Sequence, residues 1–347
     1  MKEDQKLKLP PAFSKYRSEI DAELRSVLAE RKSPLYDMMR YHLGWVDEQG
    51  RRRRDSAGKA LRPTLCLLAC EAAGGEWHTA LPAAAAIELI HNFSLIHDDI
   101  QDDDAERRHR PTVWSIWGKS QAINAGDAMH ILAEVAILRL RHHGVAVEKQ
   151  QRAQRIISET GLRLVEGQYL DISYENRLDI RVNDYLEMIE RKTASLIACS
   201  LEVGALLGTD DEAVIKGLFA FGRSLGLAFQ IRDDALGIWG DERKTGKPLG
   251  SDIRRRKKSL PIVYALERAT GKAKTELLNI YKKEVIDDQD LDAVLGILDA
   301  LKAEAYAQRI AHKYFDGALK EIGGLPLVPS LARELRGLAY FVSQREF

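Results

Sequence analysis

The chain has 347 residues, 45% hydrophobic and 30% charged, a composition typical of globular proteins that excludes a disordered, a collagen-like or a wholly membrane-embedded chain. Its 52 basic and 52 acidic residues cancel, so no overall charge attracts it to nucleic acid or to an anionic membrane surface. Any anion must therefore bind at a local cluster of charges.

The N-terminal segment MKEDQKLKLPPAF lacks the apolar core of a signal peptide. The longest apolar run, residues 194–208, contains Glu202 and is too short to span a bilayer. The cysteines, Cys66, Cys70 and Cys199, form no CxxC pair and no cluster with histidine, so neither a disulfide framework nor a structural zinc site is indicated. We expect a cytoplasmic protein with no transmembrane segment and no nucleic-acid partner.

Helical periodicity dominates the chain. Apolar side chains recur every three or four residues in two segments, at Leu89, Phe93, Ile96 and Ile100 and at Val214, Leu218, Phe221, Leu225 and Ala228. No proline interrupts the chain between Pro111 and Pro248, and short loops such as residues 73–76 separate the expected helices. We find neither βαβ units nor hairpin turns. The sequence therefore predicts an all-α fold, with residues 1–347 as one large single-domain helical bundle.

The first acidic cluster, residues 97–104, reads HDDIQDDD and follows the first of these apolar segments. Asp98 and Asp102 lie one helical turn apart and face the same way. Two carboxylates about 5 Å apart repel by roughly 3 kcal/mol at an effective dielectric near 20, so water or cations must neutralise them. Alone, the cluster fits a hydrated helix end as well as a divalent-metal site.

The second cluster, QIRDD at residues 230–234, ends the other apolar segment and is followed by Gly237 and Asp241. Two such clusters with oxygen ligands only favour Mg²⁺, which binds through a few carboxylates together with substrate phosphates. Cations that could hold those phosphates stand close to the clusters in sequence or within short motifs: Lys59, Arg62, Arg107, Arg108, Lys192, Lys244, Lys247, Lys257 and Lys258. The chain has no GxxxxGK[ST] loop, which argues against a P-loop nucleotide enzyme.

Eight motifs between Gly58 and Pro261 resemble those of the trans-type isoprenyl diphosphate synthases, also called polyprenyl synthetases. In order they are GKALRP, HNFSLIHDDIQD, RRHRPT, INAGDA, EGQYLD, KTASL, QIRDDALGIWGD and KTGKPLGSDIRRRKKSLP. The resemblance implies an all-α bundle around a deep central cavity, usually a homodimer, with two aspartate-rich motifs facing each other across three Mg²⁺ ions.

The implied activity is that of a prenyltransferase. Isopentenyl diphosphate would condense head-to-tail with an allylic diphosphate (dimethylallyl, geranyl or farnesyl) by ionisation, condensation and elimination. An apolar cavity must adjoin the charged mouth, because water would quench the carbocation.

The resemblance also assigns residues by position. The implied metal ligands are Asp98, Asp99, Asp102, Asp233 and Asp234. The implied isopentenyl diphosphate site is Lys59, Arg62, His91 and Arg108. The implied allylic diphosphate site is Arg107, Lys192, Thr193, Gln230, Lys247 and Lys257. Gln168 and Asp171 match the GQxxD element at the cavity. The catalytic set is Asp98, Asp99, Asp102, Arg107, Lys192, Asp233, Asp234 and Lys247.

Two features bear on how closely the chain follows the family. The second motif usually reads DDxxD, whereas Gly237 stands at its fifth position, and Asp241 is a candidate substitute. In the family, product length depends on residues just before the first motif, here Phe93 and Ser94. A bulky fifth residue before Asp98, without an insertion in the motif, implies a short product, and we predict geranylgeranyl diphosphate, with farnesyl diphosphate or a longer chain as alternatives.

Two other interpretations remain open at this point. A class I terpene cyclase shares the first motif, but its second motif carries Asn, Ser or Thr, and Glu, which residues 233–236 lack. A non-catalytic partner subunit of a heteromeric synthase commonly loses the aspartate pairs, and both are present here.

Overall fold

Long helices form where the sequence has no proline. The structure, a computed structural model, describes residues 10–53, 58–240 and 248–343. Both periodic segments are helical as predicted, and the all-α class is confirmed. The helices are α1 (Pro11–Leu28), α2 (Pro34–His42), α3 (Leu61–Ala72), α4 (Leu81–Gln101), α5 (Val113–Trp117), α6 (Lys119–Leu138), α7 (Val147–Tyr174), α8 (Val182–Ile189), α9 (Ser195–Gly208), α10 (Glu212–Trp239), α12 (Ser251–Arg254), α13 (Leu260–Arg268), α14 (Gly271–Ile280), α15 (Asp288–Ala300), α16 (Ala303–Gly323) and α17 (Pro329–Ser343). Single turns of 3₁₀ helix at Trp77–Ala80 and Arg139–His143 and of π-helix at Glu190–Ala194 complete the helical elements.

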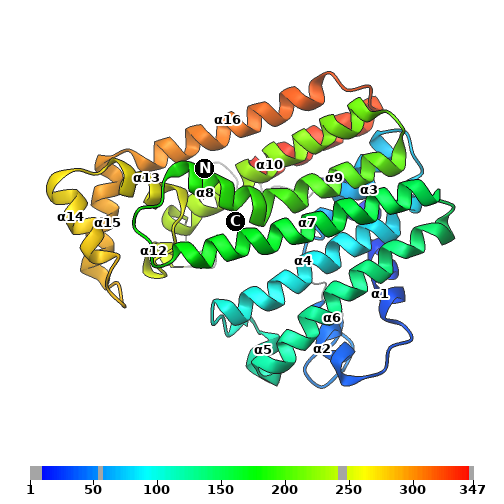
Figure 1. Cartoon of the computed structure of the whole chain (residues 1–347), viewed down its shortest axis with the longest axis horizontal. Coiled ribbons are helices and arrows are strands. Elements are labelled where there is room, and N and C mark those ends of the chain that lie inside the picture. Colours follow the sequence, from blue (N-terminus) through cyan, green and yellow to red (C-terminus); the bar gives the residue numbers. More distant parts are fainter. Residues whose placement is uncertain (1–9, 54–57, 241–247, 344–347) are drawn as a thin grey trace, which may run out of the picture.

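Small residues let the central helices pack backbone to backbone. A Cβ on Gly222 would lie 2.8 Å from the Cα of Ala198, and one on Gly226 would lie 2.6 Å from the Cα of Ala194. Helix α10 therefore runs against α9 and the π-helical turn, and Figure 1 shows α16, α10, α9, α7, α4 and α6 roughly aligned. This close approach brings the π-helical turn beside the C-terminal half of α10.

The apolar interior forms three clusters that α10 joins. Phe221 belongs to the largest cluster, Ile231 to a second with α8 and α13, and Ile238 to a third with α14 and α15, which lie at one end of the molecule (Figure 1). One helix thus contributes to every cluster. The organisation of residues 1–347 as a single domain stays a prediction that agrees with this packing.

Two helical stretches are long and apolar enough to cross a membrane, Trp77–Gln101 and Glu212–Trp239. They are core helices, since 78% and 56% of their apolar windows are buried. Burial in the bundle therefore accounts for their composition. The cytoplasmic location stays a prediction of the sequence.

A small β-hairpin after α4 departs from the expectation of no hairpin turns. Strands β1 (Glu106–Arg107) and β2 (Arg110–Pro111) are antiparallel, and the connecting Arg108 and His109 have φ of +54° and +59°. Two successive left-handed residues form the tight turn that normally uses Asn-Gly. Because Arg-His is an unusual and strained choice for this turn, residues 108 and 109 carry no turn signal.

Candidate active site

The middle of α4 (Glu88, His91 and Leu95) and the C-terminal part of α10 line one cavity of about 660 Å³ together with the loop before α3, the hairpin and the end of α17. Its charged and polar lining residues include all four residues of the implied isopentenyl diphosphate site and part of the second motif: Lys59, Arg62, Glu88, His91, Arg107, Arg108, Asp233, Asp252 and Lys257. A smaller cavity of about 220 Å³ shares Arg107 and Arg108 with it. The structure thus gathers residues from five of the eight motifs around one space.

The carboxylates of the first motif differ in whether they have a partner in the protein, since Asp99 has one and Asp98 and Asp102 have none in the described residues. The side chains of Asp98 and Asp102 have no hydrogen bond or ion pair within the described part of the chain. Burial raises the pKa of Asp98, opposed by Lys192 and reinforced by Asp102. Burial also raises the pKa of Asp102, again opposed by Lys192. Two unpaired oxygen donors one turn apart are suited to a divalent cation.

Asp99, by contrast, faces the hairpin. It is 1% exposed and accepts a hydrogen bond from Arg107 Nε at 2.6 Å, while its Oδ2 is buried without a partner. Burial raises its pKa to about 6, and Arg107 opposes the shift. Asp99 therefore fixes the arginine of the hairpin, and the carboxylates with no protein partner are its two neighbours in the motif.

The π-helical turn supplies the cation that faces the first motif. Lys192 Nζ donates to Asp171 Oδ2 at 2.6 Å, and both Asp98 and Asp102 help to raise the pKa of Lys192 against the effect of burial. Gly167 makes this approach possible, because a Cβ there would lie 2.3 Å from the backbone nitrogen of Lys192. Such π-helical turns recur at functional sites.

The GQxxD element also reaches α4 directly. Gln168 Nε2 donates to Gln101 Oε1 at 2.8 Å, which ties α7 to the helix that carries the first motif. Gln168 Oε1 is buried without a partner. Asp171 and Gln168, matched only by resemblance in the sequence, thus lie within reach of the first motif.

The second motif is divided between a cavity residue and a buried residue. Asp234 is 1% exposed, and its Oδ2 accepts from the Tyr185 hydroxyl at 2.7 Å. Its Oδ1 accepts from Gln230 Nε2 at 3.0 Å and from Lys257 Nζ at 2.8 Å. Asp233, by contrast, lines the cavity.

Thr193 extends this buried network to the π-helical turn, since its hydroxyl donates to Gln230 Oε1 at 2.9 Å. The implied allylic diphosphate residues Thr193, Gln230 and Lys257 are therefore joined through Asp234. Of the rest of that set, Lys247 lies outside the described residues, as do Lys244 and Asp241.

The structure explains why Gly237 replaces the usual aspartate. A Cβ on Gly237 would lie 2.3 Å from Asp252 Oδ2 and 2.4 Å from Asp252 Cγ. Asp252 is 6% exposed, lines the cavity and lies 3.5 Å from Lys257 Nζ through its Oδ2. A carboxylate from α12 therefore occupies the space beside position 237, and the sequence analysis, which looked to Asp241, missed it.

The implied isopentenyl diphosphate site has a half-buried arginine, Arg62, with basic neighbours. Burial lowers the pKa of His91 well below its usual range, so the neutral ring accepts an N–H of Arg62, with 3.1 Å between Nη1 and Nε2. Burial also lowers the pKa of Arg62 to about 10, against the effect of Glu88, and its Nε is buried without a partner. Arg62 thus retains a buried donor for an anion.

Gly58 lets Arg108 reach the same site. A Cβ there would lie 2.6 Å from Arg108 Nη1, and the φ of Gly58 is +58°. Glu88, which belongs to none of the eight motifs, also lines this cavity, and its Oε2 is buried without a partner among the described residues. Neither Phe93 nor Ser94 lines the cavity of 660 Å³; both are buried on α4.

A surface ion pair joins the segments that follow the two motifs. Arg255 donates to both oxygens of Asp104, at 2.6 Å and 3.3 Å, across 151 residues of sequence. This bidentate pair holds the loop after α4 near α12. No sequence pattern could have paired these two residues, since each sits in a run of like charges.

The carboxylates do not form a complete metal site alone. Within residues 10–53, 58–240 and 248–343, no three His, Cys, Asp or Glu side chains converge closely enough to hold an ion. The unpaired Asp98 and Asp102 fit Mg²⁺ nonetheless, because this ion takes much of its coordination from water and phosphate oxygens.

The Tyr185→Phe variant tests the buried network. We expect loss of the phenol to strand Asp234 Oδ2 and to lower the free energy of unfolding by about 1 to 3 kcal/mol, because a buried carboxylate oxygen then lacks its donor. Urea unfolding measures the change. Tyr174→Phe, which removes a phenol of α7 that is not bonded to Asp234, is the control, and equal stability in both variants would contradict the assignment.

The polyprenyl synthetase family pattern matches residues 44–298. The chain is 40% identical over 325 residues to the (2E,6E)-farnesyl diphosphate synthase of Mycobacterium tuberculosis (strain ATCC 25618 / H37Rv), covering 92% of this chain and 89% of that protein. It is 38% identical over 331 residues to the geranylgeranyl diphosphate synthase of the same strain, covering 95% and 92%. The crystal structure of polyprenyl synthetase from Streptomyces coelicolor A3(2) matches with a TM-score of 0.87 at 37% identity, covering 95% of this chain and 98% of that chain.

Proposed function

The chain belongs to the polyprenyl synthetase family, and we propose that it joins isopentenyl diphosphate to an allylic diphosphate with Mg²⁺ to make geranylgeranyl diphosphate. The coarser activity, that of a short-chain trans-prenyl diphosphate synthase, follows from the family and its relatives. The observation that supports the proposal is that Asp98 and Asp102, which lack side-chain partners in the described residues, lie close enough to Lys192 to raise its pKa, while Asp233 and the basic residues Lys59, Arg62 and Arg108 line one cavity. The family match decides against the terpene cyclase interpretation.

Magnesium would be held by Asp98 and Asp102 on α4 and by Asp233 on α10. When bound, it would neutralise charge on the diphosphate oxygens. Asp99 and Asp234 would not bind the metal directly but would position Arg107 and Lys257, to which they already bind. All five aspartates thus belong to the proposed site, three as metal ligands and two as residues that position basic side chains.

The side chains of this chain account for the rest of the reaction. Lys192, Arg107 and Lys257 would bind the allylic diphosphate and stabilise the charge that grows on it as the allylic C–O bond breaks. Lys59, Arg62 and Arg108 would hold isopentenyl diphosphate so that its double bond attacks the resulting cation. The proton then leaves to the released diphosphate, and the apolar interior excludes water from the cation.

The test is direct. We would incubate the purified chain with isopentenyl diphosphate, Mg²⁺ and dimethylallyl, geranyl or farnesyl diphosphate separately, and measure product chain length. Geranylgeranyl diphosphate as the main product supports the proposal. Farnesyl diphosphate as the end product would replace it with the second candidate, which the similar identities to both Mycobacterium tuberculosis enzymes favour equally. Absence of turnover by the chain alone would favour a partner-subunit role.

The Phe93→Ala variant tests the predicted length determinant. Phe93 is 5% exposed and lies five residues before Asp98, about 7.5 Å along the helix axis. We expect its truncation to open the end of the hydrocarbon site and to move the product distribution toward longer chains. Chromatography of the hydrolysed products measures this, and an unchanged distribution would place the barrier elsewhere.

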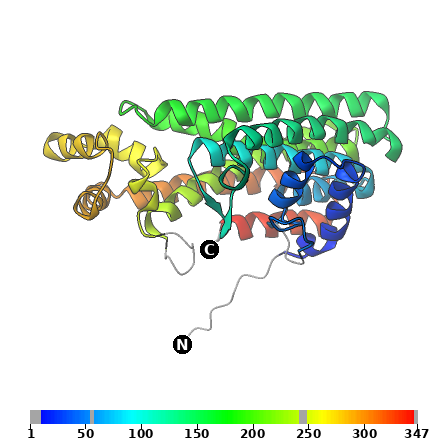
Figure 2. The ribbon, with the colours of Figure 1, turned by 90° about the horizontal axis from the view of Figure 1, so that it is seen from below.

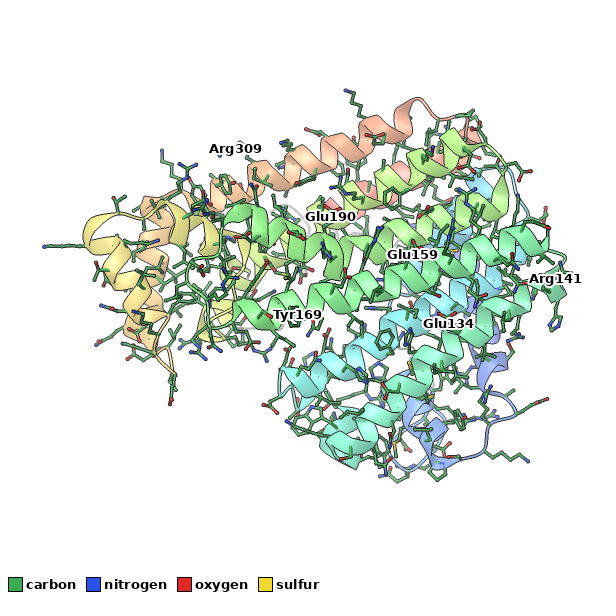
Figure 3. The ribbon with its side chains drawn as sticks, viewed as in Figure 1. Glu134, Arg141, Glu159, Tyr169, Glu190 and Arg309 are labelled. Atoms are coloured by element: carbon green, nitrogen blue, oxygen red, sulfur yellow. The ribbon has the colours of Figure 1, made fainter. Side chains whose placement is uncertain are left out.

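We also propose that the chain forms a homodimer through α6 and α7. Apolar side chains are exposed along both helices, at Ile123, Ile131, Val135 and Leu138 on α6 and at Leu162, Val165, Tyr169 and Ile172 on α7. Figure 2 shows the two helices along one edge of the molecule, and Figure 3 shows Tyr169 on α7. A second copy of the chain would bury this face, as monomers seldom expose so much apolar surface.

The Leu162→Glu variant should be monomeric. Leu162 is 61% exposed, so the fold tolerates the change, whereas a carboxylate buried in an apolar interface costs several kcal/mol. We expect the dimer dissociation constant to rise roughly 100-fold or more, measured by analytical ultracentrifugation. Val285→Glu, at a 75% exposed site beyond α14, is the control and should stay dimeric. Dimers of undiminished strength in Leu162→Glu would rule out this face.

A further inference from the structure

The helical turn that carries Lys192 is wider than a turn of α-helix. Residues 190–194 form the π-helical turn, which joins α8 to α9 without a break. The backbone N–H of Ser195 donates to Glu190 O, five residues back, and the Ser195 hydroxyl donates to Arg191 O at 2.6 Å. Because such a turn is rare and holds more residues than an α-helical turn, the surrounding fold must keep it in place.

Two neighbouring helices touch this turn through glycine. A Cβ on Gly167 of α7 would lie 2.3 Å from the backbone nitrogen of Lys192, and a Cβ on Gly226 of α10 would lie 2.6 Å from the Cα of Ala194. The wide turn therefore lies between two backbones. Glycine allows this close contact but has no side chain that could bond to the turn, so polar contacts from other residues must fix its register.

Each of these helices places a charged residue close to its glycine. Glu166 directly precedes the glycine of α7, and its Oε2 accepts from Arg191 Nη1 at 2.5 Å. Arg223 stands three residues before the glycine of α10, on the same face, and its Nε and Nη2 donate to the two carboxylate oxygens of Glu190 at 2.7 Å and 2.6 Å. Glu190 is labelled in Figure 3. Two ion pairs thus join the first two residues of the turn to α7 and α10.

The next two residues of the turn face the candidate active site. Lys192 Nζ donates to Asp171, which lies four residues after the glycine of α7. The Thr193 hydroxyl donates to Gln230, four residues after the glycine of α10. Each neighbouring helix therefore presents an ion-pair partner, a glycine and a site residue in that order along one face.

The two ion pairs lie on the surface, since the four side chains are between 37% and 46% exposed. Exposed pairs contribute little to overall stability. They act here, however, on a backbone that has an alternative. If the wide turn moved by one residue along the helix, the side chain that it passed would rotate by about 100°. Such a rotation of Lys192 would carry its Nζ away from Asp171 and from the first motif.

We propose that the ion pairs of Arg191 with Glu166 and of Arg223 with Glu190 form a clamp that holds the wide turn in register. Glu166 and Arg223 are then positioning residues, which act on the allylic diphosphate through the turn. This inference rests on the proposed function, in which Lys192 binds that diphosphate. The isopentenyl diphosphate residues come from α4, the hairpin, α3 and the loop before it, so the clamp does not act on them.

The Glu166→Gln/Arg223→Gln double variant tests the clamp. We expect KM for farnesyl diphosphate to rise roughly tenfold, since misplacement by about 1 Å costs up to 100-fold, while KM for isopentenyl diphosphate stays within about twofold of the parent. Hydrogen–deuterium exchange of the amides of residues 190–194, followed by mass spectrometry, should accelerate roughly tenfold. The melting temperature should stay within about 3 °C of the parent, because the pairs are exposed.

A charge exchange separates the ion pair from the side chains themselves. Arg223→Glu places two carboxylates together and should raise KM for farnesyl diphosphate at least as much as the double variant does. Glu190→Arg/Arg223→Glu restores an ion pair of reversed polarity and should recover most of that loss. Failure to recover would overturn the role of this pair.

Arg152→Gln is the matched control. Arg152 of α7 pairs with Glu212 at the start of α10, so this ion pair joins the same two helices away from the wide turn. Its exposure resembles that of the clamp residues, at 34% for Arg152 and 51% for Glu212. The kinetics and the exchange of residues 190–194 should equal those of the parent, and a loss equal to that of the double variant would overturn the proposal.

The two measurements separate this inference from the proposed function. Parental exchange of residues 190–194 in the double variant would overturn the clamp, and faster exchange with unchanged KM values would overturn its positioning role. Absence of turnover by the unaltered chain refutes the proposed function, whereas exchange still decides whether the clamp exists. If the double variant does not fold, Arg223→Gln undergoes the same two measurements, and parental values there overturn the proposal.

Discussion

Replacing Asp98 or Asp233 by asparagine should lower turnover roughly 100- to 1,000-fold, the usual effect of losing one group that stabilises developing charge. Asp98 has no protein partner in the described residues, and Asp233 lines the cavity, so each is placed to bind magnesium with the diphosphate. Asparagine keeps the shape and one oxygen but loses the negative charge. Steady-state kinetics at saturating substrates would measure the loss.

The Asp98→Asn variant should lose turnover without losing stability. The carboxylates of Asp98 and Asp102 repel each other, and burial already raises the pKa of both. Removing one charge relieves this repulsion, so the melting temperature without ligand should stay equal or rise, while the further rise produced by Mg²⁺ with inorganic diphosphate should shrink.

Asp103→Asn provides the control in the same cluster. Asp103 is exposed and forms an ion pair with Lys119, away from the cavity. Its turnover should stay within about twofold of the parent, as for most surface substitutions. Near-normal turnover in both Asp98→Asn and Asp233→Asn would refute the metal assignment.

Periodicity predicts the fold of this chain well, because burial is the dominant constraint on its helices. The stripe through Phe221 and Leu225 predicts α10, and the structure buries both side chains. The hairpin could not be predicted from the sequence, because it depends on tertiary contacts and not on a local pattern. Its turn is formed by Arg108 and His109 in left-handed conformations that nothing in their local sequence favours, and contacts made elsewhere in the fold must hold it.

The residues of the site likewise fall into those that a local sequence pattern predicts and those that only the fold reveals. Acidic and basic residues with a repeated local pattern, such as Asp98 and Lys192, can be proposed from sequence because their types and spacing reflect their chemistry. Tyr185 and Asp252 cannot be found this way, since each acts through a contact with α10 that the sequence does not indicate. A tyrosine within an amphipathic helix gives no sign that its hydroxyl meets a carboxylate.

Restoring the usual family residue with Gly237→Asp should damage the enzyme. The new Cβ alone would meet Asp252 Oδ2 at 2.3 Å, and overpacking of this kind costs about 1 to 3 kcal/mol. A second carboxylate beside Asp252 adds repulsion. Asp252 must move, and Lys257, whose Nζ lies 3.5 Å from it, loses part of its support. We expect turnover to fall roughly 100-fold, the scale on which misplacement by about 1 Å acts.

Two further variants separate the causes. Gly237→Ala carries the steric conflict without the charge, so its losses of stability and turnover should be smaller than those of Gly237→Asp. The double variant Gly237→Asp/Asp252→Ala removes the conflict and returns one carboxylate to the same space, so it should recover a substantial part of the turnover lost in Gly237→Asp. Kinetics and thermal unfolding of the three proteins measure this. Full activity in Gly237→Asp would show that Asp252 does not occupy that space, whereas recovery only in the double variant would mean that either position can supply the carboxylate.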